Sequence, residues 1–200
     1  MNNNLHGNAP DNSSLCLLLI DVINDFEFAG GEELLKAALP AGQRILQLKQ
    51  QARQAGVPTI YVNDNFGKWR SDFRKQVVHC LEDGVRGEPL AKLLHPQEED
   101  YFVLKPKHSG FYSTTLDTLL SYLNAKTLIL TGLTGNMCIL FTAIDAYLRD
   151  FQLFVPADCV VSIEIEENQA ALKYMQKVLK ANICPAAEID LTAVKTKKGK

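Results

Sequence analysis

The feature that most constrains this fold is the regular alternation of short apolar runs with amphipathic segments. The apolar runs are too short for helices and are typical of strands buried on both faces of a sheet. They lie at residues 15–20, 57–62, 101–104, 127–131 and 151–155. Because strands that alternate with helices form parallel sheets covered on both faces, the chain is predicted to be an α/β protein.

The segments between these runs predict the helices. Periodic apolar positions or helix-start signals favour helices at 42–55, 71–81 and 115–123, from Cys138 to about residue 149, and at 164–179. Thr114–Asp117 has the spacing of a capping box, and Ser162 is suited to cap the last of these helices. A short final strand is expected near Ile189.

Length and charge place limits on the class of protein. The chain has 200 residues and a net charge of −2, which suits one domain and does not favour a nucleic-acid partner. We expect a polar, disordered tail at 1–14, one domain at 15–192 and a basic tail at 193–200. No apolar run approaches the ~20 residues that cross a bilayer, and the start lacks a signal peptide, so we expect no membrane association and a cytoplasmic location.

Cysteine usage supports the same location. The five cysteines are an odd number without a CxxC pair, which favours a reducing compartment. Four of them are expected to be small buried hydrophobic residues: Cys16, Cys80, Cys159 and Cys184.

Three reactive side chains follow three predicted strands. Asp21 ends the run Leu15–Ile20, Lys105 ends the run Tyr101–Leu104, and Cys138 lies just past the strand at 127–131. Ligands of parallel sheets bind at the carboxyl ends of the strands, so an acid, a base and a thiol are predicted to share one edge. The first turn of a helix favours negative charge, so the pKa of the Cys138 thiol is expected to fall.

The motifs around these residues resemble those of the isochorismatase-like cysteine hydrolase superfamily. The first motif is Leu17-Leu-Leu-Ile-Asp21-Val-Ile-Asn-Asp-Phe26, and the second is Lys105-Pro-Lys-His-Ser109-Gly-Phe111. The third is Leu130-Thr-Gly-Leu-Thr134-Gly-Asn-Met-Cys138, followed by Thr142-Ala-Ile-Asp-Ala146. Together the motifs, in this order, cover most of the expected domain.

The resemblance implies a three-layer α/β/α fold with a parallel sheet of about six strands. It also implies a catalytic triad of Asp21, Lys105 and Cys138 that cleaves C–N bonds of small amides through a thioester, without a cofactor. The N–H groups of Cys138 and Thr134 are expected to bind the oxyanion, aided by a cis peptide between Leu133 and Thr134. Lys107 competes with Lys105 for the lysine role, but its spacing to Ser109 does not match the family pattern.

Departures from the family pattern refine the expected site. Nicotinamidase-like members carry an Asp-x-His metal pattern after the second strand, whereas this chain has Asn63-Asp64-Asn65, so we predict no metal. Gly110 and Gly135 are smaller than the expected residues and predict a larger pocket. Four aromatic residues in loops at this edge are candidates for substrate binding: Phe26, Phe66, Trp69 and Phe111. His108 is a further candidate for substrate contact.

Other functions remain open at this level. The main alternative is a catalytically silent relative that binds a small ligand or serves in an assembly. A nucleotide-binding module is disfavoured, because Gly132-Leu-Thr-Gly135 lacks the G-x-G-x-x-G spacing. Thiol redox chemistry lacks a resolving cysteine. The resemblance also implies a homo-oligomer, either a dimer or a tetramer, acting on a small-molecule substrate.

Overall fold

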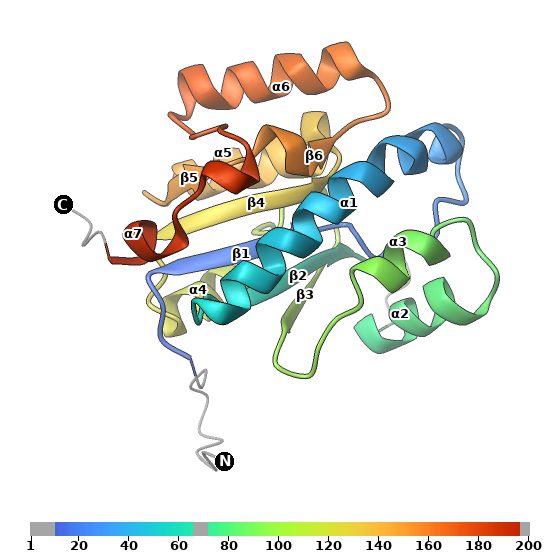
Figure 1. The fold of residues 1–200 in the computed structure, drawn as a ribbon, viewed down its shortest axis with the longest axis horizontal. Coiled ribbons are helices and arrows are strands. Elements are labelled where there is room, and N and C mark those ends of the chain that lie inside the picture. Colours follow the sequence, from blue (N-terminus) through green and yellow to red (C-terminus); the bar gives the residue numbers. More distant parts are fainter. Residues whose placement is uncertain (1–10, 66–71, 197–200) are drawn as a thin grey trace.

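The computed structural model describes residues 11–65 and 72–196. Its centre is a parallel sheet in the order β3-β2-β1-β4-β5, with β6 pairing to β4 (Figure 1). The strands are β1 (Leu15–Ile20), β2 (Thr59–Asp64), β3 (Tyr101–Lys105), β4 (Thr127–Leu133), β5 (Gln152–Phe154) and β6 (Val160–Val161). The predicted α/β class and the sheet of about six parallel strands are therefore confirmed.

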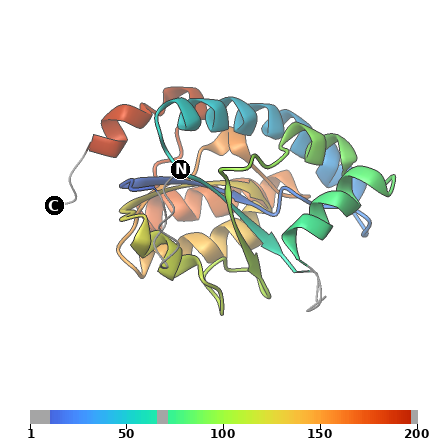
Figure 2. The same ribbon diagram turned by 90° about the horizontal axis from the view of Figure 1, so that it is seen from below.

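Helices cover both faces of the sheet (Figure 2). One layer contains α1 (Gly31–Gln54), α2 (Phe73–Glu82), α3 (Glu88–Leu93) and α7 (Leu191–Thr196). The other contains α4 (Leu116–Tyr122), α5 (Leu140–Tyr147) and α6 (Ile165–Val178). This is the expected α/β/α arrangement.

Alternate residues of the central strand explain why two layers form. In β1, Cys16, Leu18 and Ile20 pack against α4, α5 and α6, whereas Leu17 and Leu19 pack on the α1 side. All of these side chains are fully buried. Because successive strand residues point to opposite faces, a continuous apolar run supplies two hydrophobic cores.

The order of the strands determines where a ligand site can lie. From β1 the chain moves outward through β2 to β3, then returns to place β4 on the other side of β1. The switch point therefore lies between β1 and β4, where Ile20 pairs with Gly132. Ligands of such sheets bind beside this point, outside the carboxyl ends of the strands.

Gly132 permits the close approach of these two strands. It has a φ of +116°, and a Cβ at this position would lie 2.1 Å from the carbonyl oxygen of Ile20. Any side chain would therefore collide with the neighbouring backbone, so β4 can pair with β1 here only through a glycine.

Several local predictions were wrong. The sixth strand is β6, not a segment near Ile189, which follows a short 3-10 turn at Ala186–Glu188 and precedes α7. Helix α1 begins at Gly31, well before the expected start at 42, even though it contains Pro40. A short helix, α3, lies between the predicted helix at 71–81 and the predicted strand at 101–104, where no helix was expected. These differences depend on packing between elements, which local periodicity does not record.

Residues at both expected domain limits contact the rest of the domain. Ser13 is buried and its N–H donates to the carbonyl of Leu123. At the other end, α7 passes the expected boundary at 192, and Lys195 Nζ donates to the carbonyls of Ala55 and Gly56. The side chain of Lys195, a residue of the expected basic tail, thus caps the end of α1.

Two predicted caps are replaced by other contacts. The residue at the N-cap of α6 is Glu164, and Ser162 instead accepts from the N–H of Asn136 and donates to the side chain of Asn168. Thr114 accepts from the N–H of Leu116, but Asp117 does not complete a capping box. Ser162 therefore connects α6 to the turn that carries Cys138.

Three cysteine predictions are confirmed. Cys16, Cys80 and Cys159 are buried, whereas Cys184 is only partly buried. Among the described residues, no helix is both long enough and apolar enough to span a bilayer.

Candidate active site

The structure brings Asp21, Lys105 and Cys138 together. Lys105 Nζ lies 2.9 Å from Oδ2 of Asp21 and 3.4 Å from Sγ of Cys138. The carboxylate of Asp21 also lies close enough to the Cys138 thiol to raise the pKa of that thiol. Lys105 is fully buried, and the Cys138 residue is only 9% exposed. An acid and a thiol thus contact the same ammonium in a nearly dry site.

Asp21 is held by the neighbouring strand. Its N–H donates to the carbonyl of Val62, and its Oδ1 accepts from the N–H of Asp64 at 2.7 Å. Its φ of +53° is unusual for a residue other than glycine, although aspartate tolerates this region better than most residues. These contacts aim the second carboxylate oxygen at Lys105.

Lys105 reaches the same point from the opposite side of β2. It is the last residue of β3 and pairs in register with Asp64 at the end of β2. Its ammonium lies 3.4 Å from Oδ2 of Asp64, in addition to its ion pair with Asp21. Lys107, the competing lysine, is exposed and makes none of these contacts in the described part of the chain.

Cys138 lies in a π-helical turn, Gly135–Ile139, between β4 and α5. The N–H groups of Met137 and Ile139 both donate to the carbonyl of Thr134. The wider turn replaces the regular helix that was expected to begin at Cys138. π-Turns are frequent at functional sites, and this one places the sulfur over the ends of the strands.

The pKa of the thiol differs from its expected direction. Burial, together with the negative charge of Asp21, raises the pKa of Cys138 to about 12 against the opposing effect of Lys105. The position near a helix start suggested a lower pKa, but the loss of hydration outweighs that effect.

Burial acts on the two partners as well. It raises the pKa of Asp21, and the charge of Lys105 only partly opposes this shift. For Lys105, burial alone lowers the pKa, but the charges of Asp21 and Cys138 outweigh it, so the pKa of the ammonium rises. Asp21 thus becomes a stronger proton acceptor, beside an ammonium that keeps its charge.

The expected cis peptide is absent from the structure. The described residues contain no cis peptide bond, so the bond between Leu133 and Thr134 is trans. Leu133 still pairs with Val161 of β6, and Thr134 has an extended backbone with φ −92° and ψ 147°. An extended strand end therefore leads directly into the π-helical turn.

The described aromatic candidates belong to the core rather than to a pocket. Phe26 is fully buried in the cluster under α1, with its ring 6.2 Å from that of Phe28. Phe111 is buried under α4, and the guanidinium of Arg149 lies 4.7 Å from its ring centre. Phe66 and Trp69, the other two candidates, lie outside the described residues.

The two small residues do not enlarge the site. A Cβ on Gly110 would lie 2.9 Å from Val62, and one on Gly135 would lie 2.1 Å from Oδ1 of Asn168. Neighbouring side chains already fill the space that larger residues would need. Both glycines therefore allow close packing of the loops and do not widen a pocket.

Two residues, Asp64 and His108, lie nearer to the triad than the sequence pattern indicated. Asp64 was considered only in relation to a metal pattern, yet it contacts both Lys105 and Asp21. Its place at the end of β2 was the available signal. His108 has Nδ1 3.9 Å from the sulfur of Cys138, and its contact with substrate stays a prediction.

The prediction of no metal concerns the end of β2. Asn63 donates from Nδ2 to the carbonyl of Ile23, and the Asp64 carboxylate faces Lys105. Among the described residues, no group of three or more histidine, cysteine, aspartate or glutamate side chains could hold a metal ion. The absence of a metal stays a prediction.

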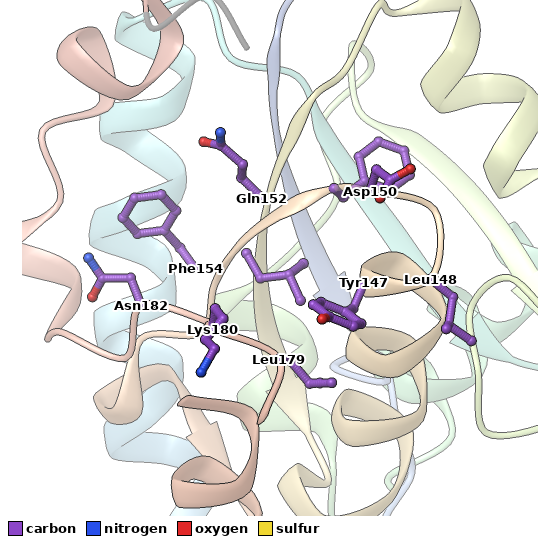
Figure 3. A pocket seen from close by; sticks show the side chains of 10 residues that line it. Tyr147, Leu148, Asp150, Gln152, Phe154, Leu179, Lys180 and Asn182 are labelled. Carbon is purple, nitrogen blue, oxygen red and sulfur yellow. The ribbon is translucent and has the colours of Figure 1, made fainter. Parts of the chain in front are cut away.

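A cavity of about 610 Å³ lies elsewhere, beside the edge strand β5 (Figure 3). It opens near the carboxyl ends of α5 and α6, at the opposite end of the strands from the triad. Its lining residues are Tyr147, Leu148, Asp150, Phe151, Gln152, Leu153, Phe154, Leu179, Lys180 and Asn182. Since no residue of the triad contributes to it, this cavity is separate from the candidate active site.

Comparison with known proteins shows the family to which this chain belongs. The isochorismatase domain matches residues 15–187, so the chain belongs to the isochorismatase family. It is 43% identical over 173 residues to an uncharacterized isochorismatase family protein, YaaI, of Bacillus subtilis (strain 168), covering 86% of this chain and 94% of that protein.

More distant relatives have named activities. The chain is 27% identical to a ureidoacrylate amidohydrolase, RutB, of Methylorubrum extorquens, covering 75% of this chain and 71% of the relative. The crystal structure of N-carbamoylsarcosine amidase from Thermoplasma acidophilum is similar, with a TM-score of 0.68, 26% identity, and coverage of 88% of this chain and 99% of that one. The family therefore includes hydrolases that act on amides.

Proposed function

We propose that this protein is a cysteine hydrolase that cleaves a C–N bond of a small amide, ureido or carbamoyl compound. The observation that carries this proposal is the contact of Lys105 with both Asp21 and Cys138 at the carboxyl edge of the sheet. The amidohydrolase activities named for two relatives support the same class of substrate.

The first half of the proposed reaction forms a thioester. Asp21 accepts the proton of the Cys138 thiol, and the sulfur bonds to the substrate carbonyl carbon. The C–N bond then breaks, and the proton held by Asp21 balances the charge on the leaving nitrogen. Because burial raises the pKa of the thiol, the attack needs a proton acceptor, and Asp21 supplies it.

The second half releases the acid. Asp21 accepts a proton from water, whose oxygen bonds to the thioester carbon, and the C–S bond breaks. The sulfur regains a proton from Asp21. Throughout the cycle Lys105 compensates the negative charge that moves between Asp21 and the sulfur, which a buried site requires.

The oxyanion is assigned to the N–H groups of Cys138 and Thr134. A turn at the end of a strand can present such groups to a substrate, and the loss of one donor typically costs ~10²-fold or more in rate. Thr134 offers a further polar atom: its Oγ1 is buried and has no hydrogen-bond partner among the described residues. A substrate could satisfy this hydroxyl.

Self-association and a small-molecule substrate are part of the proposal. Met137, Phe141 and Leu148 are exposed large apolar residues along the turn and α5, with Leu148 70% exposed. Exposed apolar side chains that gather in one patch favour contact with another protein surface. Light scattering tests the proposed dimer or tetramer, and a monomeric mass at micromolar concentration would contradict it.

The function is tested by ammonia release from a panel of primary amides, ureido acids and carbamoyl compounds. We expect the wild type to release ammonia from at least one compound and Cys138→Ala to release none above background. Cys184→Ala is the matched control, since Cys184 is partly buried and makes no contact with the triad in the described structure. Equal rates for Cys138→Ala and the wild type would exclude this mechanism and favour a ligand-binding or assembly role.

A further inference from the structure

His108 lies on the solvent side of the Cys138 sulfur. Its Nδ1 is 3.9 Å from Sγ, and the residue is exposed. The other two groups at the sulfur, Asp21 and Lys105, are buried. A substrate that enters from solvent and reaches the sulfur therefore meets the imidazole before it meets either buried partner.

The loop that carries His108 is hydrogen-bonded to the turn that carries Cys138. The N–H of Gly110 donates to Oγ1 of Thr142 at 3.0 Å, and that hydroxyl donates to the carbonyl of Cys138 at 2.6 Å. One side chain thus connects both segments. The spacing between the imidazole and the sulfur is set by this connection rather than by a mobile surface loop.

Two further contacts act on the same loop. Ser109 Oγ donates to Oδ2 of Asp145 on α5 at 2.5 Å. The His108 ring packs beside Phe141, with 5.5 Å between ring centres. Ser109 is therefore hydrogen-bonded to α5, and the His108 ring lies against the same helix. This geometry presents the imidazole to a group that is bonded to the sulfur.

We propose that His108 is a catalytic residue that exchanges protons with the leaving nitrogen and with the hydrolytic water. The inference rests on the proposed function and reassigns the outer proton transfers from Asp21 to His108. Asp21 lies at the buried side of the sulfur and is paired with Lys105, so it is well placed for the thiol proton. A leaving nitrogen on the solvent side is nearer to His108.

The protons balance with this division. In acylation, the thiol proton moves to Asp21, the S–C bond forms, the C–N bond breaks, and the imidazolium of His108 protonates the leaving nitrogen. In deacylation, neutral His108 accepts a proton from water, the new C–O bond forms, the C–S bond breaks, and Asp21 returns its proton to the sulfur. The carboxylic acid product releases its own proton to solvent, and both residues regain their starting states.

The test compares two leaving groups. The primary amide that the wild type hydrolyses fastest in the panel is paired with the 4-nitrophenyl ester of the same acid, whose leaving group needs no proton. In His108→Gln, kcat/KM is expected to fall ~10²-fold or more for the amide and less than ~10-fold for the ester, because general acid catalysis typically contributes ~10²–10⁴-fold. Lys107→Gln, a neighbouring exposed change, should retain the wild-type value for both.

The rate of alkylation of Cys138 shows whether the loss of His108 changes the reactivity of the sulfur or only the protonation of the leaving group. Iodoacetamide should modify Cys138 at a similar rate in His108→Gln and in the wild type, because Asp21 remains next to the thiol. Equal losses on amide and ester, or no loss on either, would overturn the role of His108. A wild type that hydrolyses no amide would overturn the proposed function, and this inference with it.

Discussion

Oδ2 of Asp21 lies 2.9 Å from Nζ of Lys105, and neither side chain has more than slight access to solvent. The two residues are separated by most of the first half of the chain and join only because β1 and β3 flank β2. A buried ion pair of this kind contributes little to stability by itself, but removing one partner leaves a costly unpaired charge. The charges of the pair act instead on the neighbouring thiol: Asp21 raises the pKa of Cys138 and Lys105 lowers it.

The substitution Asp21→Asn is expected to change the pKa of the thiol and the rate of turnover in different ways. The carboxylate of Asp21 raises the pKa of Cys138, so the substitution should lower that pKa, as measured by the ultraviolet absorbance of the thiolate during a pH titration. Turnover should nevertheless be lost, because the proton acceptor is gone. Asp25→Asn, in the same loop, is the control. An Asp21→Asn enzyme with wild-type turnover would contradict the role of Asp21.

The pH dependence of alkylation reports the thiol pKa directly. Since burial raises the pKa of Cys138 to about 12, the thiolate fraction of the wild type should keep rising with pH above neutrality. The rate of Cys138 modification by iodoacetamide should increase roughly tenfold per pH unit where the thiolate reacts. Peptide mapping after labelling identifies the residue. A plateau near neutral pH would show that the sulfur is ionised at rest.

Lys105→Met should destabilise the fold in a pH-dependent way. With its partner removed, buried Asp21 is left with an uncompensated charge, and the loss is expected to be about 3–5 kcal/mol near neutral pH. The pKa of Asp21 is already raised by burial and should rise further without Lys105. A raised pKa means that stability is lost as pH increases through it, so the variant should recover stability in mild acid.

Urea unfolding at several pH values measures this effect. Lys107→Met, which changes an exposed lysine two residues away, should leave the unfolding free energy near that of the wild type. A loss for Lys105→Met that stays constant with pH would indicate a packing defect rather than an unpaired carboxylate.

Thr142→Val tests the connection between the loop that carries His108 and the turn that carries Cys138. The variant keeps the shape of the side chain but removes the hydroxyl that contacts both Gly110 and Cys138. Leaving these buried groups unsatisfied should cost about 1–3 kcal/mol of unfolding free energy. Thr118→Val on the exposed face of α4 is the matched control. Stability equal to the wild type would argue against a structural connection.

Gly132→Ala tests the approach of β4 to β1. The added Cβ would lie 2.1 Å from the carbonyl oxygen of Ile20, at a φ of +116°. Gly84→Ala is a sharp comparison, because Gly84 also has a positive φ but no atom within 4 Å of the added Cβ. The first change should destabilise the protein by at least ~2 kcal/mol more than the second, whose cost is backbone strain alone. Similar thermal midpoints would contradict this.

Features that depend on short stretches of sequence could be predicted. The apolar run before Asp21 is a strand, and the pairing of Asp145 with Arg149 follows from i,i+4 spacing. Asp21, Lys105 and Cys138 were placed at one edge because parallel strands direct their carboxyl ends the same way. The family motifs then assigned one role to each.

Features that depend on burial could not be predicted in the same way. Phe26 looked like a pocket residue from its place in a loop, yet it fills the core beneath α1. Gly110 looked like space for a substrate, yet Val62 and Leu116 occupy that space. Loop position gives no measure of which side chains from other segments will pack against a residue.

The amino-acid sequence by itself determined the parallel α/β order and the delivery of an acid, an ammonium and a thiol to one edge, because strand period and strand direction are local properties. Only the tertiary structure decided how these groups behave there. The pKa of the Cys138 thiol rises rather than falls because hydration is lost when distant strands close around the sulfur. The nearness of His108 likewise depends on a hydrogen bond between its loop and helix α5, which lie apart in the chain.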